Sequence, residues 1–298
     1  MRVARAFSPA GLSGFFSAYI TPGEPLRSGA KGGGLTLGRG VIVRVEAEEA
    51  SETAIKTLLE GQPASMDVTR RVAERVLALK GEPFQVTIDQ RIEVPVGGGL
   101  GTSGASALAT ALAVASAVGV RATYTELARI AHVVEVEAGT GLGTVSGLAV
   151  GGLVLVVGPG PPGADRVERI PIEPSIRVVV GFFSPMSKRA TVGRADLGRI
   201  NRLGEEALAR VLEDPSPERF VKESWRFALK AGLATPRVVR GVEIAAKSGA
   251  IGASQAMIGE TVYALADPDV ATTIKERFEA LGAKSFVTGV DWCPARLL

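Results

Sequence analysis

The pattern of apolar and polar residues in the first half of the chain predicts short strands combined with longer helices. Apolar and polar positions alternate in the strand-like segments, whereas the helix-like segments repeat their apolar residues every three or four positions. The predicted strands cover residues 35–45, 84–88, 92–94 and 151–157. The predicted helices cover residues 66–80, 105–118 and 123–137. Both kinds of element are therefore expected in the same half.

The second half begins after a glycine- and proline-rich run at residues 158–163, which predicts a loop. The strands that follow are predicted at 176–183, near 253, at 262–265 and at 285–290. The helices are predicted at about 194–213, 217–231, 236–248 and 267–281. Strands separated by helices with short turns indicate an α+β fold, of the ferredoxin-like sandwich type. We predict two domains, residues 1–165 and residues 166–298.

One segment, between the strand at 92–94 and the helix at 105–118, is suited to binding phosphate. A helix N-terminus offers unpaired N–H groups and a partial positive charge, and glycines let the backbone approach phosphate oxygens closely. Two hydroxyl residues in the turn could provide oxygen ligands for a metal–phosphate unit. The predicted nucleotide-binding residues are Pro95, Gly97, Gly98, Gly99, Leu100, Gly101, Thr102, Ser103, Gly104, Ala105 and Ser106.

Other interpretations of this glycine-rich segment are a Walker loop, a dinucleotide-binding loop and a simple tight connection. A Walker loop is excluded because the required Gly-Lys-Ser/Thr sequence is absent. A dinucleotide-binding loop lacks the acidic residue expected about 20 positions further on, at the end of a second strand. A simple tight connection stays open. The segment therefore indicates a nucleotide-phosphate loop of another type.

The sequence from Pro95 to Ala105 resembles the phosphate-binding motif of the GHMP kinases, which phosphorylate small alcohols. Two further segments, 6–16 near the start and 252–259 near the end, are similar to the first and third motifs of that family. The resemblance implies a two-domain kinase that uses ATP and Mg²⁺. It also implies an N-terminal α/β domain and a C-terminal ferredoxin-like domain, with the active site in the cleft between them.

Within the family, details spread over nearly the whole chain are most similar to the archaeal branch that acts on pantoate. These details include residues 14–16, 28–34, 140–145, 232–237 and 254–257. The resemblance implies phosphorylation of the terminal hydroxyl of pantoate to 4-phosphopantoate in coenzyme A biosynthesis. Two alternatives stay open: another small-alcohol kinase, such as a homoserine or shikimate kinase, and a nucleotide-binding sensor without turnover.

The resemblance also implies a metal site and leaves the catalytic base open. The family ligates Mg²⁺ through the second hydroxyl of its motif, here Ser103, together with a carboxylate from the following helix, here Glu135, with Glu137 as the alternative. These two glutamates point in different directions from a helix, so only one can face the site. The usual aspartate base and first-motif lysine are replaced, the former by Thr144. Lys31 is the preferred catalytic substitute, and His132, the only histidine, is a weaker one.

Pantoate combines a carboxylate with a branched apolar centre, so its site needs a cationic or N–H-rich pocket and an apolar wall. Phe15 or Phe16 is a candidate for the wall, and Arg189 is a weaker candidate for the cation. The predicted substrate-binding residues are Ser8, Ser13, Arg27, Ser28, Lys31, Ser254 and Gln255. Of these, Arg27 to Lys31 are expected in a glycine-rich loop.

The amino-acid composition argues against two further classes of protein, nucleic-acid-binding proteins and membrane-spanning proteins. The formal net charge of +3 is carried by scattered residues, and aromatic residues are only 5% of the chain, which argues against nucleic-acid binding. No signal peptide is visible, and the apolar stretch 105–120 is too short and too weakly hydrophobic for a membrane span. A cytoplasmic enzyme is expected, with a homodimer as the default assembly. One asparagine and few glutamines suggest a thermophilic source.

Overall fold

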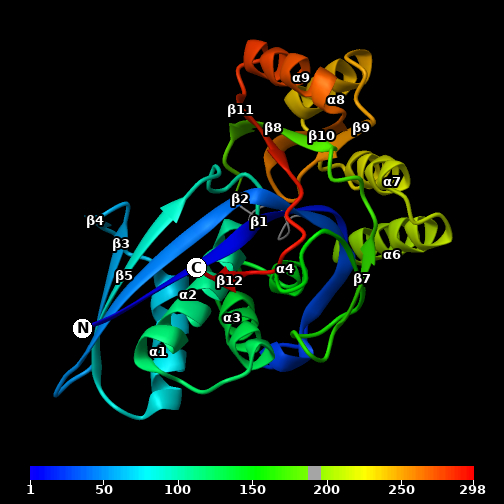
Figure 1. The fold of residues 1–298 in the computed structure, drawn as a ribbon. Helices are drawn as coiled ribbons and strands as arrows, with labels where there is room; N and C mark the ends of the chain where they lie inside the picture. Colours follow the sequence, from blue (N-terminus) through cyan, green and yellow to red (C-terminus); the bar gives the residue numbers. More distant parts are fainter. Residues whose placement is uncertain (187–195) are drawn as a thin grey trace.

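The computed structural model describes residues 1–186 and 196–298, and its elements fall into two sheets with their helices (Figure 1). The strands are β1 (Arg2–Tyr19), β2 (Gly29–Glu49), β3 (Ala54–Leu59), β4 (Gln62–Pro63), β5 (Phe84–Ile92), β6 (Leu153–Gly158), β7 (Arg166–Ile170), β8 (Arg177–Ser184), β9 (Gly252–Gln255), β10 (Glu260–Ala266), β11 (Lys284–Gly289) and β12 (Arg296–Leu297). The helices are α1 (Asp67–Lys80), α2 (Thr102–Val118), α3 (Tyr124–Ala138), α4 (Thr144–Leu148), α6 (Leu197–Glu213), α7 (Pro217–Lys230), α8 (Pro236–Lys247) and α9 (Pro268–Ala280), with a 3-10 turn at Pro25–Arg27.

The larger sheet runs in the order β12-β1-β2-β5-β3-β4, and β2 also pairs with β6, which continues to β7. The long strands β1 and β2 form its centre as an antiparallel pair. Helices α1, α2 and α3 cover one face, and α2 lies between the sheet and the other two helices. This position explains its sequence, because a helix surrounded by protein is apolar on every side.

The smaller sheet has the order β11-β8-β10-β9, and every neighbouring pair in it is antiparallel. Helices α8 and α9 cover one face of it. In chain order, the first strand of this sheet, β8, pairs with the last strand, β11, and with the third strand, β10. This strand order is that of the ferredoxin-like fold. The predicted α+β class and the ferredoxin-like second half are therefore confirmed.

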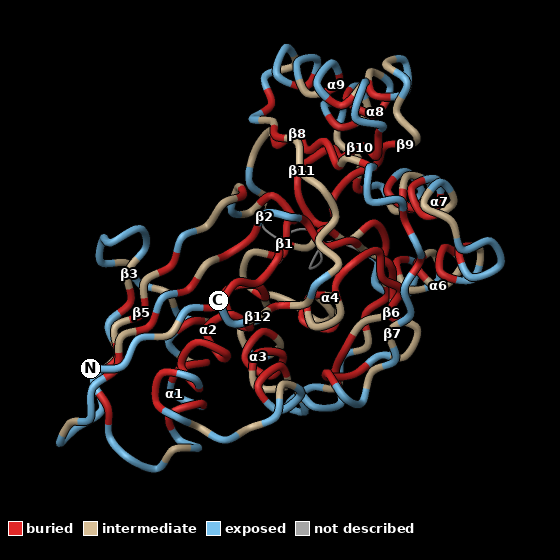
Figure 2. Tube along the Cα trace, in the orientation of Figure 1, coloured by how far each residue is buried: buried red, intermediate tan, exposed pale blue. Residues whose placement is uncertain are grey.

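A shared hydrophobic core joins the two sheets. It combines Leu12 and Leu35 of the larger sheet with Val180 and Tyr263 of the smaller sheet, and Phe220 of α7 packs among them. Figure 2 shows buried backbone running through both sheets and along the inner sides of the helices. Helices α6 and α7 pack directly on β1, so the second half of the chain is held against the strand that carries the first motif.

The structure corrects several predicted elements. Helix α2 begins at Thr102 instead of residue 105, so both hydroxyl residues of the phosphate loop lie in its first turn. Lys31 lies within strand β2, not in a loop, because β2 pairs with β1 from Gly29 onward. The strands β7 and β12 follow residue 165 yet belong to the larger sheet. The division into domains at that residue stays a prediction.

The length and apolar content of the helices bear on whether the chain could span a membrane. No helix in the described part of the chain is long and apolar enough to cross a membrane. The predictions of a cytoplasmic protein, a homodimer and a thermophilic archaeal source stay predictions.

Candidate active site

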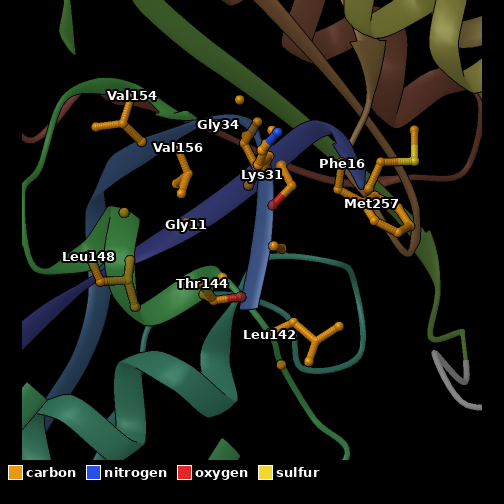
Figure 3. A pocket seen from close by; sticks show the side chains of 18 of the residues that line it. Gly11, Phe16, Lys31, Gly34, Leu142, Thr144, Leu148, Val154, Val156 and Met257 are labelled. Atoms are coloured by element: carbon orange, nitrogen blue, oxygen red, sulfur yellow. The ribbon is translucent and has the colours of Figure 1, made fainter. Parts of the chain in front are cut away.

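A pocket of about 450 Å³ is lined by the first motif, strand β2 and the turn at residues 139–144, together with Met257 and Ile258 of the third motif (Figure 3). That volume is within the range typical of small-molecule sites. In Figure 3, Val154 and Val156 lie on one side, Phe16 and Met257 lie on the other, and Lys31 lies between them. Among the lining residues that the structure describes, Lys31 is the one with a charged side chain. The pocket is therefore an apolar chamber with one cation.

The phosphate loop has the backbone that the glycines predict. Gly97, Gly99 and Gly101 have φ values of 78°, 75° and 61°, in the left-handed region that other residues seldom adopt. Gly101 is the N-cap of α2, and no side chain caps the first turn. The first N–H groups of α2 are thus left for an anion, which the helix dipole also favours.

Three segments distant in sequence hold this loop behind the residues that line the pocket. The N–H of Gly11 donates to the carbonyl oxygen of Leu100 at 3.1 Å. A Cβ atom on Gly99 would lie 2.8 Å from the carbonyl oxygen of Ala256, and one on Gly101 would lie 2.9 Å from the Thr144 methyl. The first and third motifs and the start of α4 therefore fix the loop, and glycine is required for this close approach.

A buried carboxylate lies beside the first turn of α2. Glu135 on α3 is 2% exposed, and its Oε1 accepts a hydrogen bond from the Ser103 hydroxyl. The Thr140 hydroxyl donates to the same oxygen at 2.6 Å. A Cβ atom on Gly141 would lie 2.4 Å from Glu135 Oε2, so this glycine leaves room for the carboxylate. Because Thr140 and Gly141 line the pocket, Glu135 lies directly behind its wall.

The other predicted glutamate faces away from the site. Glu137 forms ion pairs with Arg71 at 2.5 Å and with Arg75 at 2.7 Å, both on α1. The two glutamates are separated by two positions on α3 and hence point in different directions. The structure therefore brings Glu135, and not Glu137, to Ser103.

The surroundings of Glu135 suit a divalent cation. Among the described residues, no lysine or arginine forms an ion pair with Glu135, although buried charges in proteins are paired or bind metals. No group of three acidic, histidine or cysteine side chains that could hold an ion is present in the described residues. Mg²⁺ commonly binds through one or two protein oxygens together with substrate phosphates. Ser103 and Glu135 fit that mode.

A second polar cluster adjoins the pocket at Lys31. Lys31 Nζ is 2.9 Å from Oε1 of Glu205 on α6, and the Tyr19 hydroxyl donates to the same oxygen. Lys31 Nζ also lies 5.2 Å from the centre of the Tyr19 ring, a cation–π contact. The ion pair with Glu205 raises the pKa of Lys31 above its ordinary value, while partial burial opposes this rise. Lys31 is therefore fully charged at neutral pH.

Several predicted substrate-binding residues do not line this pocket. Arg27 is exposed and pairs with Glu24 at 3.1 Å, and the Ser28 hydroxyl bonds within its own turn. Ser8 is buried, with its hydroxyl 3.3 Å from the Pro9 carbonyl oxygen. Of the predicted set, Ser13 and Lys31 line the pocket. Arg189 lies outside the described residues.

The third motif supports the pocket through its backbone. The Gln255 amide donates to the carbonyl oxygens of Leu233 at 3.1 Å and Gly259 at 2.9 Å, and Ser254 beside it is fully buried. The Met257 N–H donates to the Ser13 carbonyl oxygen at 2.8 Å. Ser254 and Gln255 therefore shape the turn, and the neighbouring Met257 and Ile258 line the pocket.

His132 lies apart from the pocket. Its Nε2 lies 3.0 Å from the Ser28 carbonyl oxygen and 3.3 Å from that of Pro25. Burial lowers the pKa of His132, although these two carbonyls oppose the shift. The histidine thus fastens the turn before β2 and is not placed to act as a base in this pocket.

Comparison with known proteins agrees with this geometry. The family model described as "GHMP kinases N terminal domain" matches residues 67–152, which include the phosphate loop and Glu135. The pantoate kinase of Thermococcus kodakarensis is 31% identical over 279 residues, covering 91% of this chain and 90% of that protein. This chain belongs to the GHMP kinase family. The pantoate kinase of Methanocaldococcus jannaschii is 30% identical, covering 87% of this chain and 91% of that protein.

Solved structures of GHMP kinase type also match over the full length. A "phosphotransferase related to CoA biosynthesis pathway" superposes with a TM-score of 0.90 at 27% identity, covering 99% of this chain and 98% of that one. A homoserine kinase from Cytophaga hutchinsonii has a TM-score of 0.78 at 16% identity, covering 100% of this chain and 98% of that chain, which shows a shared fold alone. The predicted family and fold are confirmed.

Residue Glu205 was not found by sequence reasoning. It lies 174 positions from Lys31 and in no glycine-rich motif. The charged helix 197–213 gives no signal that separates Glu205 from its neighbour Glu206. Only the packing of α6 on β1 brings it to the pocket.

Proposed function

We propose that this GHMP kinase transfers the γ-phosphoryl group of ATP to the terminal hydroxyl of pantoate, giving 4-phosphopantoate for coenzyme A synthesis. The observation that carries the proposal is the arrangement of one pocket. The phosphate loop and the Ser103–Glu135 pair lie directly behind the lining residues Gly11, Thr140 and Thr144, and Lys31 is the one cation among the described lining residues. Relatives named pantoate kinase, which match about nine-tenths of the chain, support the choice of acceptor.

The lining residues of the pocket complement the groups of pantoate. Lys31 would bind the carboxylate, and the apolar side chains of Phe16, Val154 and Val156 would surround the two methyl groups. The hydrogen bond from the Met257 N–H to the Ser13 carbonyl oxygen holds these two lining residues together. With the carboxylate held at Lys31, the terminal hydroxyl is directed toward the phosphate loop.

Phosphoryl transfer requires mainly alignment and stabilisation of charge on the phosphate oxygens. The N–H groups at the start of α2 would hold the nucleotide phosphates. Ser103 and Glu135 would hold Mg²⁺, which neutralises charge on the β- and γ-phosphates when bound. No carboxylate is among the described lining residues, and Thr144, at the position of the family's usual aspartate, is the first residue of α4. The proton of the attacking hydroxyl is therefore expected to leave to a phosphoryl oxygen or to water.

The proposal is tested by measuring ADP release from ATP–Mg²⁺ with D-pantoate, homoserine, shikimate, mevalonate and pantothenate in parallel. Turnover with D-pantoate alone is expected. Turnover with homoserine or shikimate in its place would contradict the acceptor but not the kinase. ATP binding without turnover on any alcohol would contradict catalysis and indicate a nucleotide sensor.

A further inference from the structure

The partner of Lys31 raises a question that the proposed function leaves open. A free ammonium group would attract a substrate carboxylate more strongly than one already paired with Glu205 at 2.9 Å. The structure nevertheless holds this glutamate at the one cation among the lining residues that are described. Either Glu205 merely fixes Lys31, or it also contacts the substrate.

The position of Glu205 is built by specific packing of α6 on β1. Asn201 accepts a hydrogen bond from the Ala18 N–H at 2.7 Å and donates to the Ala18 carbonyl oxygen at 2.8 Å. A Cβ atom on Gly204 would lie 2.1 Å from the Phe16 carbonyl oxygen, so the helix approaches the strand as closely as glycine permits. Glu205 follows directly and is thereby fixed relative to Phe16, which lines the pocket.

The carboxylate of Glu205 is also held in its charged form. Burial alone raises the pKa of Glu205, but hydrogen bonds from Tyr19 and Lys31 outweigh that effect, so its pKa falls below the ordinary value. Its side chain is 39% exposed, and it adjoins the pocket through its contact with Lys31, which lines it. A carboxylate has about four lone-pair positions. It can therefore accept a further hydrogen bond while Lys31 and Tyr19 are bound.

We infer that Glu205 is a specificity residue, which accepts a hydrogen bond from a substrate hydroxyl adjacent to the carboxylate that Lys31 binds. The inference rests on the proposed function. An α-hydroxy acid presents a carboxylate and a hydroxyl on neighbouring carbons, and the Lys31–Glu205 pair presents an ammonium group and a carboxylate side by side. Pantoate is an α-hydroxy acid, so each group of the pair meets a complementary group.

The test compares D-pantoate with its analogue that lacks the hydroxyl beside the carboxylate, 2-deoxypantoate. The analogue cannot form the proposed hydrogen bond to the Glu205 carboxylate. Because a hydrogen bond to a charged group contributes strongly to binding, the wild-type enzyme should prefer D-pantoate by roughly 10- to 100-fold in kcat/KM. In Glu205→Ala the preference should fall to about 3-fold or less, because the acceptor is gone. Glu205→Gln, which keeps the size of the side chain, should also reduce the preference, since an amide oxygen is a weaker acceptor.

The control is Glu206→Ala, which removes a neighbouring glutamate that pairs with Arg210 at 3.4 Å on the same helix. It should keep the wild-type preference. A preference that is unchanged in both Glu205 variants would overturn the inference, because a merely structural glutamate would affect both substrates equally. Absence of D-pantoate turnover in the wild-type enzyme would instead overturn the proposed function, so the two failures are distinguishable.

Discussion

Two carboxylates adjoin the pocket, and the contrast between their surroundings separates two kinds of site. Glu135, beside the first turn of α2, is 2% exposed and, among the described residues, its side chain accepts hydrogen bonds from hydroxyls alone. Glu205, beside Lys31, is partly exposed and already forms an ion pair with that residue. A buried carboxylate with no described cationic partner is suited to receive a cation, whereas a paired carboxylate is suited to orient one.

The strongest test of this contrast replaces the buried carboxylate. In Glu135→Gln, turnover with ATP–Mg²⁺ should fall by about 1,000-fold, because the charge that would hold the cation is lost. The Mg²⁺ concentration needed for half-maximal rate should also rise. Steady-state kinetics at varied Mg²⁺ checks both effects.

The matched control for that test is Glu137→Gln on the same helix, since Glu137 pairs with Arg71 and Arg75 away from the site. It should retain most of the activity. Equal losses of activity in the two variants would contradict a special role for Glu135 at the metal. Both losses would then be explained by a general loss of protein stability.

The hydroxyl partner of Glu135 gives the next largest effect. Ser103→Ala should lower kcat by about 100-fold while the fold is preserved, because one oxygen near the transferred phosphate is removed. Kinetics together with far-UV circular dichroism checks this expectation. Ser116→Ala, at an exposed position on the same helix, is the control. Unchanged activity in Ser103→Ala would refute its proposed role at the metal.

A smaller and more selective effect on the kinetic constants is expected when Lys31, the proposed acceptor-binding residue, is replaced. Lys31→Ala should raise the KM for D-pantoate by about 10- to 100-fold, through loss of a charge-assisted contact, and should change the KM for ATP much less. Kinetics with each substrate varied in turn measures both constants. A larger change in the KM for ATP than in the KM for D-pantoate would assign Lys31 to nucleotide binding and contradict its proposed role at the acceptor.

The smallest effect concerns stability. The pKa of Glu205 is lowered in the folded protein, so its stabilising contribution is present above the unfolded value of about 4.3 and lost as pH falls through the folded value. Because the pair is partly exposed, this contribution should be below about 1 kcal/mol. Glu205→Gln should therefore melt up to about 3 °C below wild type at pH 7.

The pH dependence makes that prediction specific. The difference in Tm between wild type and Glu205→Gln should shrink as the pH is lowered from 5 to 3, because protonation of Glu205 removes its charge in the wild-type protein. Thermal melts across this range provide the measurement. A difference that persists at pH 3 would mean that the variant alters packing and not the ion pair.

Much of the fold was predictable because its signals are local. The capping box at Thr123 and Glu126 begins α3 where the pattern predicts it, and the order of strands and helices after residue 176 agrees with the structure. The phosphate loop was predictable for the same reason, since consecutive glycines determine their own backbone. The small strand β7 and the short helix α4 were not predicted, because each contains few residues with a periodic pattern.

The sequence by itself determined the GHMP kinase family, the phosphate loop and the pair of candidate glutamates. Only the tertiary structure decided that Glu135 faces Ser103 while Glu137 faces α1. It also decided that Arg27 and Ser28 lie outside the pocket and that Glu205 reaches Lys31. The physical reason is the range of the forces involved: glycine turns and helix starts depend on neighbouring residues, whereas converging side chains depend on the packing of strands and helices far apart in the chain.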